Sequence, residues 1–229
     1  MGLIRKVYRE FSNADIYNAC RLYLGTDTAW LDGRTLHSCV AEAIVGGVSF
    51  VQLRTRNLST LDAIRKARAL IPVCRVANVP LVIGNDLDAA KAAGVDGVHI
   101  DRAGVSCAEV RRELGRDAIV GVSVQTPEQA REAEDSGASY LICGPLFAGR
   151  EDAPEKTVPL GVVRDVVGEV DIPVVGMGGV NAANVPELSG LGLSGVASVS
   201  AVLAAPDVET AAGGLVREVD AYIRSERII

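Results

Sequence analysis

The chain has 229 residues, of which 48% are hydrophobic and 23% are charged, and its formal net charge is −6. Such a chain can bury a sizeable core, whereas the acidic balance and an aromatic content of 4% disfavour nucleic acid as a partner. No apolar run approaches the roughly 20 residues that cross a membrane, and the N-terminus lacks the apolar run of a signal peptide. We therefore expect a cytoplasmic protein with no membrane partner.

Residues 1–20 are predicted to form an extra helix before the first strand. From residue 21 onward, short apolar runs alternate with Ala-rich amphipathic stretches such as "TLDAIRKARALIPVCRVA" and "TPEQAREAEDSG". The apolar runs predict strands near residues 21–27, 49–55, 80–85, 97–100, 118–124, 140–146, 173–179 and 195–200.

Several of these runs are apolar throughout, as expected for strands that are buried on both faces. Strands that alternate with helices indicate βαβ units and a parallel sheet. Eight such units in about 200 residues predict a (β/α)₈ TIM barrel, with an open doubly wound sheet as the alternative. No linker or charge block divides the chain, so we expect a single domain over 1–229, with the barrel core over 21–205.

Polar residues gather where the predicted strands end, which is where the active sites of such barrels lie. The seventh strand ends on Gly178-Gly179, and the eighth ends on "SVS", which includes Val199 and Ser200. Glycines let backbone N–H groups approach an anion, and the N-terminus of a following helix would add partial positive charge. These loops therefore predict a phosphate site, although barrel glycines also serve strand–helix packing. We expect Gly179→Val to weaken phosphate binding with little loss of fold.

A cationic cluster follows the second strand in "QLRTR", where Gln52, Arg54 and Arg56 alternate along one face. Guanidinium groups bind phosphate through a planar fork, so this face suits a polyanion such as pyrophosphate. The alternative is a solvated strand end or an ion pair with an acid such as Asp86. Asn85 and Asp86 end the third strand, where Asp86 is a candidate Mg²⁺ ligand or a helix N-cap.

The five cysteines are odd in number and contain no C-x-x-C, which disfavours a disulfide framework and a zinc site. Cys20 and Cys143 are predicted to be buried apolar residues. His37 and His99 are the two histidines, and His99 is predicted to be a hydrogen-bonded residue at a strand end. Trp30, which follows the first strand, suits either a ring pocket or a lid.

The ordered motifs "YLGTD", "GGVSFVQLRTR", "VPLVIGNDLDAAKAAGVDGVHI", "IVGVSV", "GPLF", "IPVVGMGGV" and "GVASVSAV" resemble the thiamine phosphate synthase and thiazole tautomerase family of (β/α)₈ barrels. The resemblance spans roughly residues 21–205. It implies a synthase that joins hydroxymethylpyrimidine pyrophosphate to thiazole phosphate with Mg²⁺-assisted loss of pyrophosphate. The substrates would then be small phosphorylated heterocycles.

The resemblance also implies roles for individual residues. Arg54, Arg56 and Ser123 match groups near the leaving pyrophosphate, and Asp86 matches a magnesium ligand. The substrate-binding set would be Gln52, Arg54, Arg56, Asn85, Ser123, Gly178, Gly179, Val199 and Ser200.

Two segments depart from the family pattern. Gly104 stands where the synthases usually carry a second magnesium-binding Asp, with Asp101 three residues earlier as a shifted substitute. The loop "GPLFAGREDAPEKT" has lost the family's two threonines and its lysine, and Ala148, Gly149, Glu151 and Asp152 occupy that motif. Arg150 and Lys156 are the cations that remain in this loop.

Three hypotheses therefore stay open. The first is a thiamine phosphate synthase, and the second is a thiazole tautomerase or another family enzyme that acts on a phosphorylated heterocycle. The tautomerase branch usually carries an acid–base histidine where this chain has Gln125, which cannot act as a general base. The third is a non-catalytic protein that binds a phosphate ligand. A monomer and a homo-oligomer are both compatible with the sequence.

Overall fold

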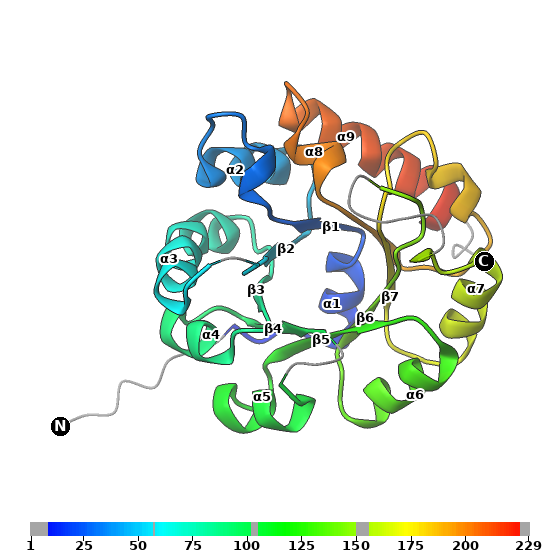
Figure 1. The fold of residues 1–229 in the computed structure, drawn as a ribbon, viewed down its shortest axis with the longest axis horizontal. Coiled ribbons are helices and arrows are strands. Elements are labelled where there is room, and N and C mark those ends of the chain that lie inside the picture. Colours follow the sequence, from blue (N-terminus) through cyan, green and yellow to red (C-terminus); the bar gives the residue numbers. More distant parts are fainter. Residues whose placement is uncertain (1–8, 57, 102–104, 150–155, 225–229) are drawn as a thin grey trace.

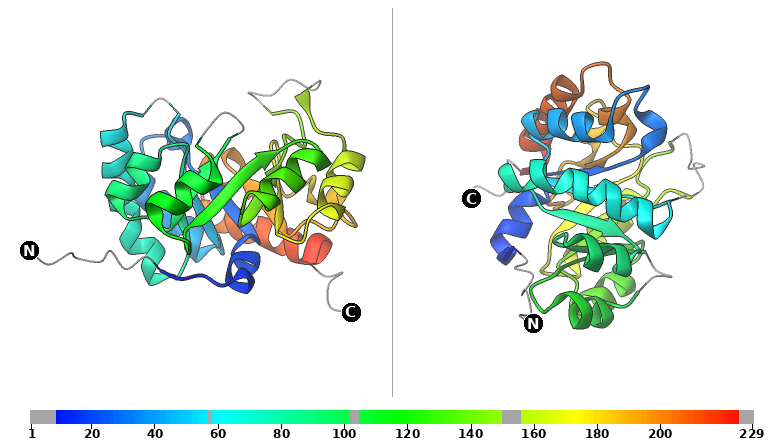
Figure 2. Two further views of the ribbon diagram at one scale, coloured as in Figure 1. Left: turned by 90° about the horizontal axis from the view of Figure 1, so that it is seen from below. Right: turned by 90° about the vertical axis from the view of Figure 1, so that its left-hand side faces the viewer.

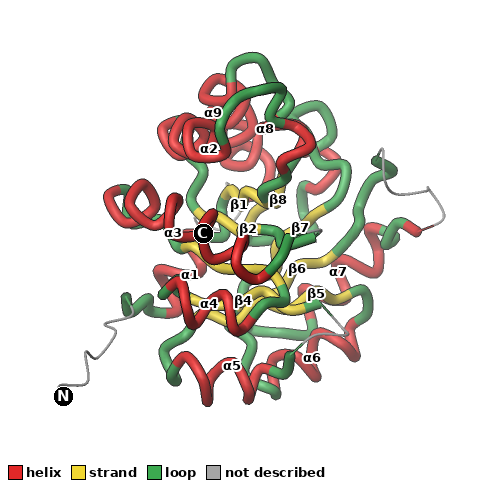
Figure 3. The backbone as a smooth tube through the Cα atoms, turned by 60° about the vertical axis from the view of Figure 1, so that its left-hand side comes forward, coloured by secondary structure: helices red, strands yellow, loops and turns green. Residues whose placement is uncertain are grey.

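A computed structural model of the protein describes residues 9–56, 58–101, 105–149 and 156–224. Eight parallel strands follow one another around a closed barrel, and helices form a layer outside it (Figures 1 and 3). The strands are β1 Leu22–Gly25, β2 Phe50–Leu53, β3 Leu81–Gly84, β4 Gly97–Ile100, β5 Ile119–Val124, β6 Tyr140–Cys143, β7 Val174–Met177 and β8 Gly195–Ser198. The closure confirms the predicted (β/α)₈ barrel and excludes the open doubly wound sheet.

The helical segments alternate with the strands as the amphipathic stretches predict. They are α1 Asn13–Ala19, η1 Thr28–Trp30, α2 Leu36–Val45, α3 Thr60–Val76, α4 Leu87–Ala93, α5 Cys107–Leu114, α6 Pro127–Asp135, α7 Leu160–Gly168, η3 Val185–Leu188, α8 Ser200–Leu203, α9 Val208–Val219 and η4 Asp220–Arg224. None of the helices in the described residues combines the length and apolarity that crossing a bilayer requires.

All eight predicted strands are present, and most are a few residues shorter than their apolar runs. The ring closes where β1 pairs with β8, with Leu22 opposite Val196 and Tyr23 opposite Ala197. Because side chains alternate along a strand, the barrel separates two buried clusters. Tyr23, Phe50 and Tyr140 belong to the inner cluster, whereas Leu22, Leu24 and Val196 pack in the outer cluster under the helices.

The short helix α1 covers the end of the barrel at which the strands begin (Figures 1 and 2). Ser12 and Asp15 form a capping box at its start, and its Ile16 and Ala19 pack against the inner cluster. Just before it, Arg9 Nε donates to Asp96 Oδ1 at 3.0 Å. With this end covered, the end at which the strands finish remains for a binding site.

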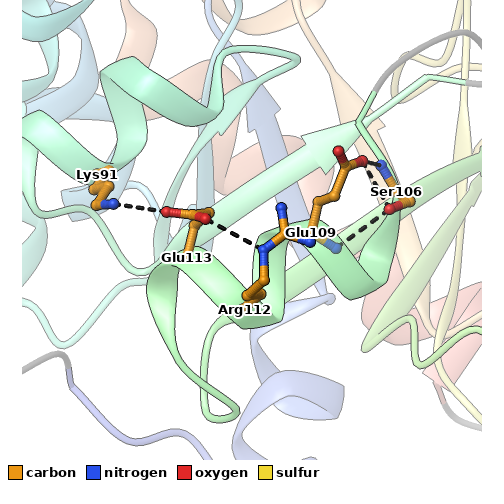
Figure 4. Close-up of polar contacts among 5 residues, drawn as sticks. All are labelled: Lys91, Ser106, Glu109, Arg112 and Glu113. Atoms are coloured by element: carbon orange, nitrogen blue, oxygen red, sulfur yellow. Dashed lines mark hydrogen bonds and ion pairs between the residues drawn. The ribbon is translucent and has the colours of Figure 1, made fainter.

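In the outer layer, an exposed ion pair joins α4 to α5 (Figure 4). Lys91 Nζ lies 2.7 Å from Glu113 Oε2, and Arg112 Nε lies 3.3 Å from Glu113 Oε1. The hydrogen bond from Lys91 is the largest cause that lowers the pKa of Glu113. Ser106 and Glu109 form the capping box that begins α5. Such exposed ion pairs add little stability and lie outside the barrel, away from its mouth.

Candidate active site

A cavity of about 640 Å³ opens where the barrel strands end. A smaller lobe of about 70 Å³ adjoins it, and Arg54, Arg56, Asp101 and Met177 line both spaces. The predicted site residues in the larger space are Arg54, Arg56, Ser123, Gly178, Gly179, Val199 and Ser200. Those in the smaller lobe are Gln52, Arg54, Arg56 and Asn85. Barrel closure thus brings together every predicted site residue except Asp86, which lines neither space.

The cationic side of the cavity comes from the end of β2. Gln52 is still in the strand and is buried, whereas Arg54 is half-buried and Arg56 is exposed just beyond it. The backbone N–H of Arg54 donates to Thr26 Oγ1 at 3.2 Å, and Arg54 Nη1 lies 3.8 Å from Asp27 Oδ2. Arg54 thus has an acidic partner of the kind that the alternative named, but this acid is Asp27 on the adjacent β1 loop and not Asp86.

Polar groups from three neighbouring strand ends meet at Asp101. Asn85 Nδ2 donates to Asp101 Oδ2 at 2.7 Å, and Asn85 Oδ1 accepts from the Asp101 backbone N–H at 2.8 Å. Ser123 Oγ donates to Asp101 Oδ1 at 3.1 Å. Asn85 has a φ of 54°, a left-handed conformation that asparagine tolerates better than most residues. The carboxylate of Asp101 therefore faces the cavity in a fixed orientation.

Behind Ser123, polar contacts continue into the barrel interior. His99 Nε2 lies 2.9 Å from Ser123 Oγ, and His99 Nδ1 lies 3.1 Å from the Tyr140 hydroxyl. The Tyr140 hydroxyl is 3.1 Å from that of Tyr23, which in turn is 3.1 Å from Gln52 Oε1. Burial lowers the pKa of His99 to about 4 despite the opposing effect of Asp101. His99 is thus a neutral, hydrogen-bonded residue at a strand end, as predicted.

Gly121 makes room for these interior contacts. A Cβ atom at this position would lie 2.2 Å from Tyr140 Cζ and 2.5 Å from His99 Nδ1. Since carbon atoms prefer separations of about 3.5–4.0 Å, no side chain fits there unless the rings move. The glycine of β5 therefore lets the phenol of β6 reach the imidazole of β4.

The two glycines after β7 have a structural role that the sequence did not reveal. A Cβ atom on Gly178 would lie 2.5 Å from Pro145 Cα, and one on Gly179 would lie 2.7 Å from the Phe147 carbonyl oxygen. The loop after β6 is pressed against them, and the Phe147 N–H donates to the Gly178 carbonyl at 3.0 Å. The expectation that Gly179→Val would spare the fold is therefore wrong.

The helix expected directly after these glycines is also absent from this part of the described chain. The helical segment that follows β7 is the short 3₁₀ helix η3 at Val185–Leu188, several residues downstream. Instead, Asn181 Nδ2 and Asn184 Nδ2 both donate to the Gly179 carbonyl, at 3.2 and 3.0 Å. The loop after β7 would thus offer a phosphate its backbone groups only, whereas the short helix α8 begins at Ser200 directly after β8.

The resemblance implies magnesium, an ion that is usually held by one or two carboxylates and by substrate phosphates. Asp86 Oδ1 accepts from the Ala89 N–H at 2.8 Å as the N-cap of α4, so one oxygen of Asp86 is engaged. Asp101 is the carboxylate that lines the cavity. Among the described residues, no group of three or more His, Cys, Asp or Glu side chains could hold a metal. One or two carboxylates fit an ion that is bound mainly through substrate phosphates.

Several cavity residues were not assigned a role from the sequence. Trp30 lines the cavity from the loop after β1, and Pro145, Met177 and Asn181 line it from the later loops. Ala148 and Gly149 also line it, whereas Arg102, Gly104, Arg150, Glu151 and Asp152 lie outside the described residues. Gln125 lines the cavity and donates to the Gly144 carbonyl at 3.2 Å, and Lys156 is exposed.

The buried tyrosines Tyr23 and Tyr140 were also missed. Each is the hydroxyl-bearing residue of its strand, LYLG or YLIC, and that was the available signal. Cys143 is fully buried, as predicted, and burial raises the pKa of its thiol to about 12. Cys20 is fully buried as well, and burial raises its thiol pKa strongly.

The family model for thiamine monophosphate synthase matches residues 22–202, which include all eight strands. The chain belongs to the thiamine monophosphate synthase family. It is 39% identical over 191 residues to a thiamine-phosphate synthase of Ruminiclostridium cellulolyticum, a match that covers 83% of this chain and 91% of the relative. It is 38% identical over 196 residues to one of a Roseiflexus species, which covers 85% of this chain and 83% of the relative.

A solved structure of the thiamine phosphate pyrophosphorylase from Pyrococcus furiosus is similar to this chain, with a TM-score of 0.81 and 30% identity. The match covers 90% of this chain and 98% of that structure. The residues that the family model matches supply the strands and the loops that line the cavity.

Proposed function

We propose that the protein is a thiamine-phosphate synthase that joins hydroxymethylpyrimidine pyrophosphate to thiazole phosphate and releases pyrophosphate, in thiamine biosynthesis. The observation that carries this proposal is the convergence of two arginines, Ser123 and the loops after β7 and β8 on one cavity, in a chain of this family. Both substrates are small phosphorylated heterocycles. The cavity offers the cationic side chains of Arg54 and Arg56 on one side and the backbone of Gly178 and Gly179 on the other.

In the proposed reaction, the bond between the pyrimidine methylene carbon and the pyrophosphate oxygen breaks, and its electron pair leaves with the pyrophosphate. The thiazole nitrogen then donates its lone pair to that carbon. Arg54 and Arg56 would hold the departing oxygens, since guanidinium groups bind phosphate through paired N–H donors. Ser123 would donate its hydroxyl hydrogen to the same group. The protein's main contribution is thus to stabilise developing negative charge and to align the rings.

The thiazole phosphate would bind at Gly178, Gly179, Val199 and Ser200. These residues lie at the ends of β7 and β8, the usual phosphate site of such barrels. Close packing of Phe147 against Gly179 would hold this loop in place before the ligand arrives. Pre-organisation of this kind lowers the entropic cost of binding.

Asp86 is the proposed magnesium ligand, with Asp101 as the carboxylate that already faces the cavity. A bound Mg²⁺ would neutralise part of the charge on the pyrophosphate oxygens. Asn85 would hold the Asp101 carboxylate in position for the ion, because its amide bonds both the side chain and the backbone of Asp101. Asp86→Ala should raise the Mg²⁺ concentration needed for half-maximal turnover, and an unchanged requirement would transfer the role to Asp101.

The test is a turnover assay with both precursors and MgCl₂, in which thiamine phosphate and pyrophosphate are measured. Arg54→Ala should lower turnover by about ten-fold or more, as expected for the loss of a hydrogen bond to a charged group. Arg56→Lys keeps the positive charge at this position and should retain most activity. Gln125→Ala should have a small effect, and a complete loss in that variant would favour a tautomerase-like enzyme.

The altered loop supports one alternative, a non-catalytic binder of a phosphate ligand. Glu151 and Asp152 bring negative charge to a segment that binds pyrophosphate in the family pattern. Calorimetry should then show tighter binding of thiazole phosphate than of the pyrimidine pyrophosphate. The variant Gly149→Thr/Glu151→Thr/Asp152→Lys should raise synthase turnover. A parent enzyme that the triple variant does not improve would mean that other groups have replaced the lost contacts.

A further inference from the structure

Four polar contacts join the cavity to the centre of the barrel in one unbroken chain. They run from Ser123 to His99, then to Tyr140, Tyr23 and Gln52, with separations of 2.9, 3.1, 3.1 and 3.1 Å. His99, Tyr140 and Tyr23 are almost completely buried, so water cannot replace a missing hydrogen in this chain. Each contact therefore needs one hydrogen from one of its two partners.

The hydrogens can be assigned from the cavity inward. Ser123 has one hydroxyl hydrogen, and it goes to Asp101 because an ionised carboxylate only accepts. Ser123 Oγ must then accept from His99, which requires the hydrogen of the imidazole to be on Nε2. A neutral imidazole carries only one hydrogen, so Nδ1 accepts from the Tyr140 hydroxyl.

The same count continues to the end of the chain. Tyr140 has used its hydrogen on His99, so its oxygen accepts from the Tyr23 hydroxyl. Tyr23 then has no hydrogen left for Gln52 Oε1, the atom that faces it at 3.1 Å, so this last contact requires the amide nitrogen of Gln52 to take the place of that oxygen. The amide oxygen and nitrogen have nearly the same shape, so a half-turn of the group leaves the 3.1 Å separation intact. All hydrogens then point from Gln52 towards the cavity.

The opposite direction fails at the cavity. If His99 carried its hydrogen on Nδ1, its Nε2 would accept the Ser123 hydrogen. Ser123 Oγ and the Asp101 carboxylate, 3.1 Å apart, would then face each other without a hydrogen between them. Two such oxygens would repel each other.

We propose that Tyr140 is a positioning residue that, through the Nε2–H tautomer of His99, holds the Ser123 hydroxyl as a hydrogen-bond donor towards the cavity. With Ser123 Oγ accepting from His99, its one hydrogen points away from the imidazole, and Ser123 would present it to an anionic oxygen of the departing pyrophosphate in place of Asp101. The kinetic part of this inference rests on the proposed function. Burial raises the pKa of the Tyr140 phenol well above 10, which keeps its hydrogen in place.

The hydroxyl can be removed without disturbing the ring. Tyr140 packs with its ring centroid 5.0 Å from that of Phe50 and 5.8 Å from that of Tyr23, and these contacts do not involve its oxygen. Tyr140→Phe should therefore fold, and it deletes the donor to His99 together with the oxygen that accepts from Tyr23. Tyr222→Phe is the matched control, because Tyr222 is 40% exposed and lies outside the barrel interior.

The first measurement is steady-state synthesis of thiamine phosphate. Tyr140→Phe should lower kcat by about ten-fold with little change in KM, the size expected for one hydrogen bond to a charged group. Tyr222→Phe should match the parent. On a Ser123→Ala background, Tyr140→Phe should cause no further loss, because the two residues act through the same hydrogen. An unchanged kcat, or losses that multiply in the double variant, would overturn the proposal.

The second measurement does not depend on activity. The chain has two histidines, so ¹⁵N-histidine NMR of the His37→Gln variant reports His99 directly. The expected signal is the Nε2–H tautomer, and Tyr140→Phe should shift the population towards Nδ1–H. The Nδ1–H tautomer in the parent would overturn the proposal even if the enzyme is active. If the parent enzyme makes no thiamine phosphate, the proposed function is refuted. The tautomer of His99 would still show in which direction the hydrogens point along the contacts from Ser123 to Gln52.

Discussion

Gly121→Ala should destabilise the fold although it adds a single methyl group. The new Cβ would lie 2.2 Å from Tyr140 Cζ and 2.3 Å from its hydroxyl oxygen. To restore an ordinary carbon–carbon separation of about 3.5 Å, the ring would have to retreat by about 1.3 Å. Phe50 and Tyr23 already pack against that ring, with centroids 5.0 and 5.8 Å away.

Overpacking of this kind typically costs about 1–3 kcal/mol, and loss of the His99–Tyr140 hydrogen bond adds about 1 kcal/mol. We therefore expect the free energy of unfolding to fall by about 2–4 kcal/mol, which equilibrium urea denaturation can measure. The matched control is Gly161→Ala in α7, where an added Cβ meets nothing within 4 Å. That variant should be unchanged or slightly more stable, since alanine is the better helix former. A Gly121→Ala variant within about 0.5 kcal/mol of the parent would refute the packing argument.

Three further predictions concern packing and burial. Gly179→Ala should lower the free energy of unfolding by about 1–3 kcal/mol, because its Cβ would press on Phe147. Gly33→Ala, also at positive φ but in open space, should lower it less, and equal urea midpoints for the two variants would contradict this. The pKa of His99 is about 4 in the folded protein, below its ordinary 6.5, so the unfolded chain binds the extra proton. Stability should fall by about 2–3 kcal/mol as pH drops from about 6.5 to 4, with a flatter profile in His99→Gln. Cys143, buried with its pKa raised to about 12, should resist a thiol reagent at pH 7 until the protein unfolds, and rapid native labelling would show otherwise.

Much of the architecture follows from local patterns in the sequence. Each strand of the barrel is buried on both faces, so its apolar run is continuous and is recognisable without any neighbour. The cations of "QLRTR" and the polar pair Asn85-Asp86 are visible for a similar reason, because polar residues that end an apolar strand need solvent or a ligand. The order of these motifs also indicated the family that the comparisons then showed.

Closure of the barrel was decided by the tertiary structure, because an open parallel sheet has the same alternation of strands and helices. Pairing of β1 with β8 brings Tyr23 within 3.1 Å of Tyr140, although 117 positions separate them in the chain. Pairing of β1 with β2 likewise places Arg54 beside Asp27 and not beside Asp86. No local pattern encodes such pairings, since they depend on which strands become neighbours.

The glycines after β7 show most clearly which features the sequence could not predict. The pair Gly178-Gly179 indicates that some other group lies close to the backbone. At positive φ, glycine tolerates such an approach because it has no side chain. What approaches was decided by the packing of the β6 loop, whose Pro145 and Phe147 fill the space where a Cβ would be. The sequence by itself thus determined the strands, their polar ends and the need for bare backbone. The three-dimensional fold decided the partners, because contact between distant segments depends on the geometry of the whole barrel.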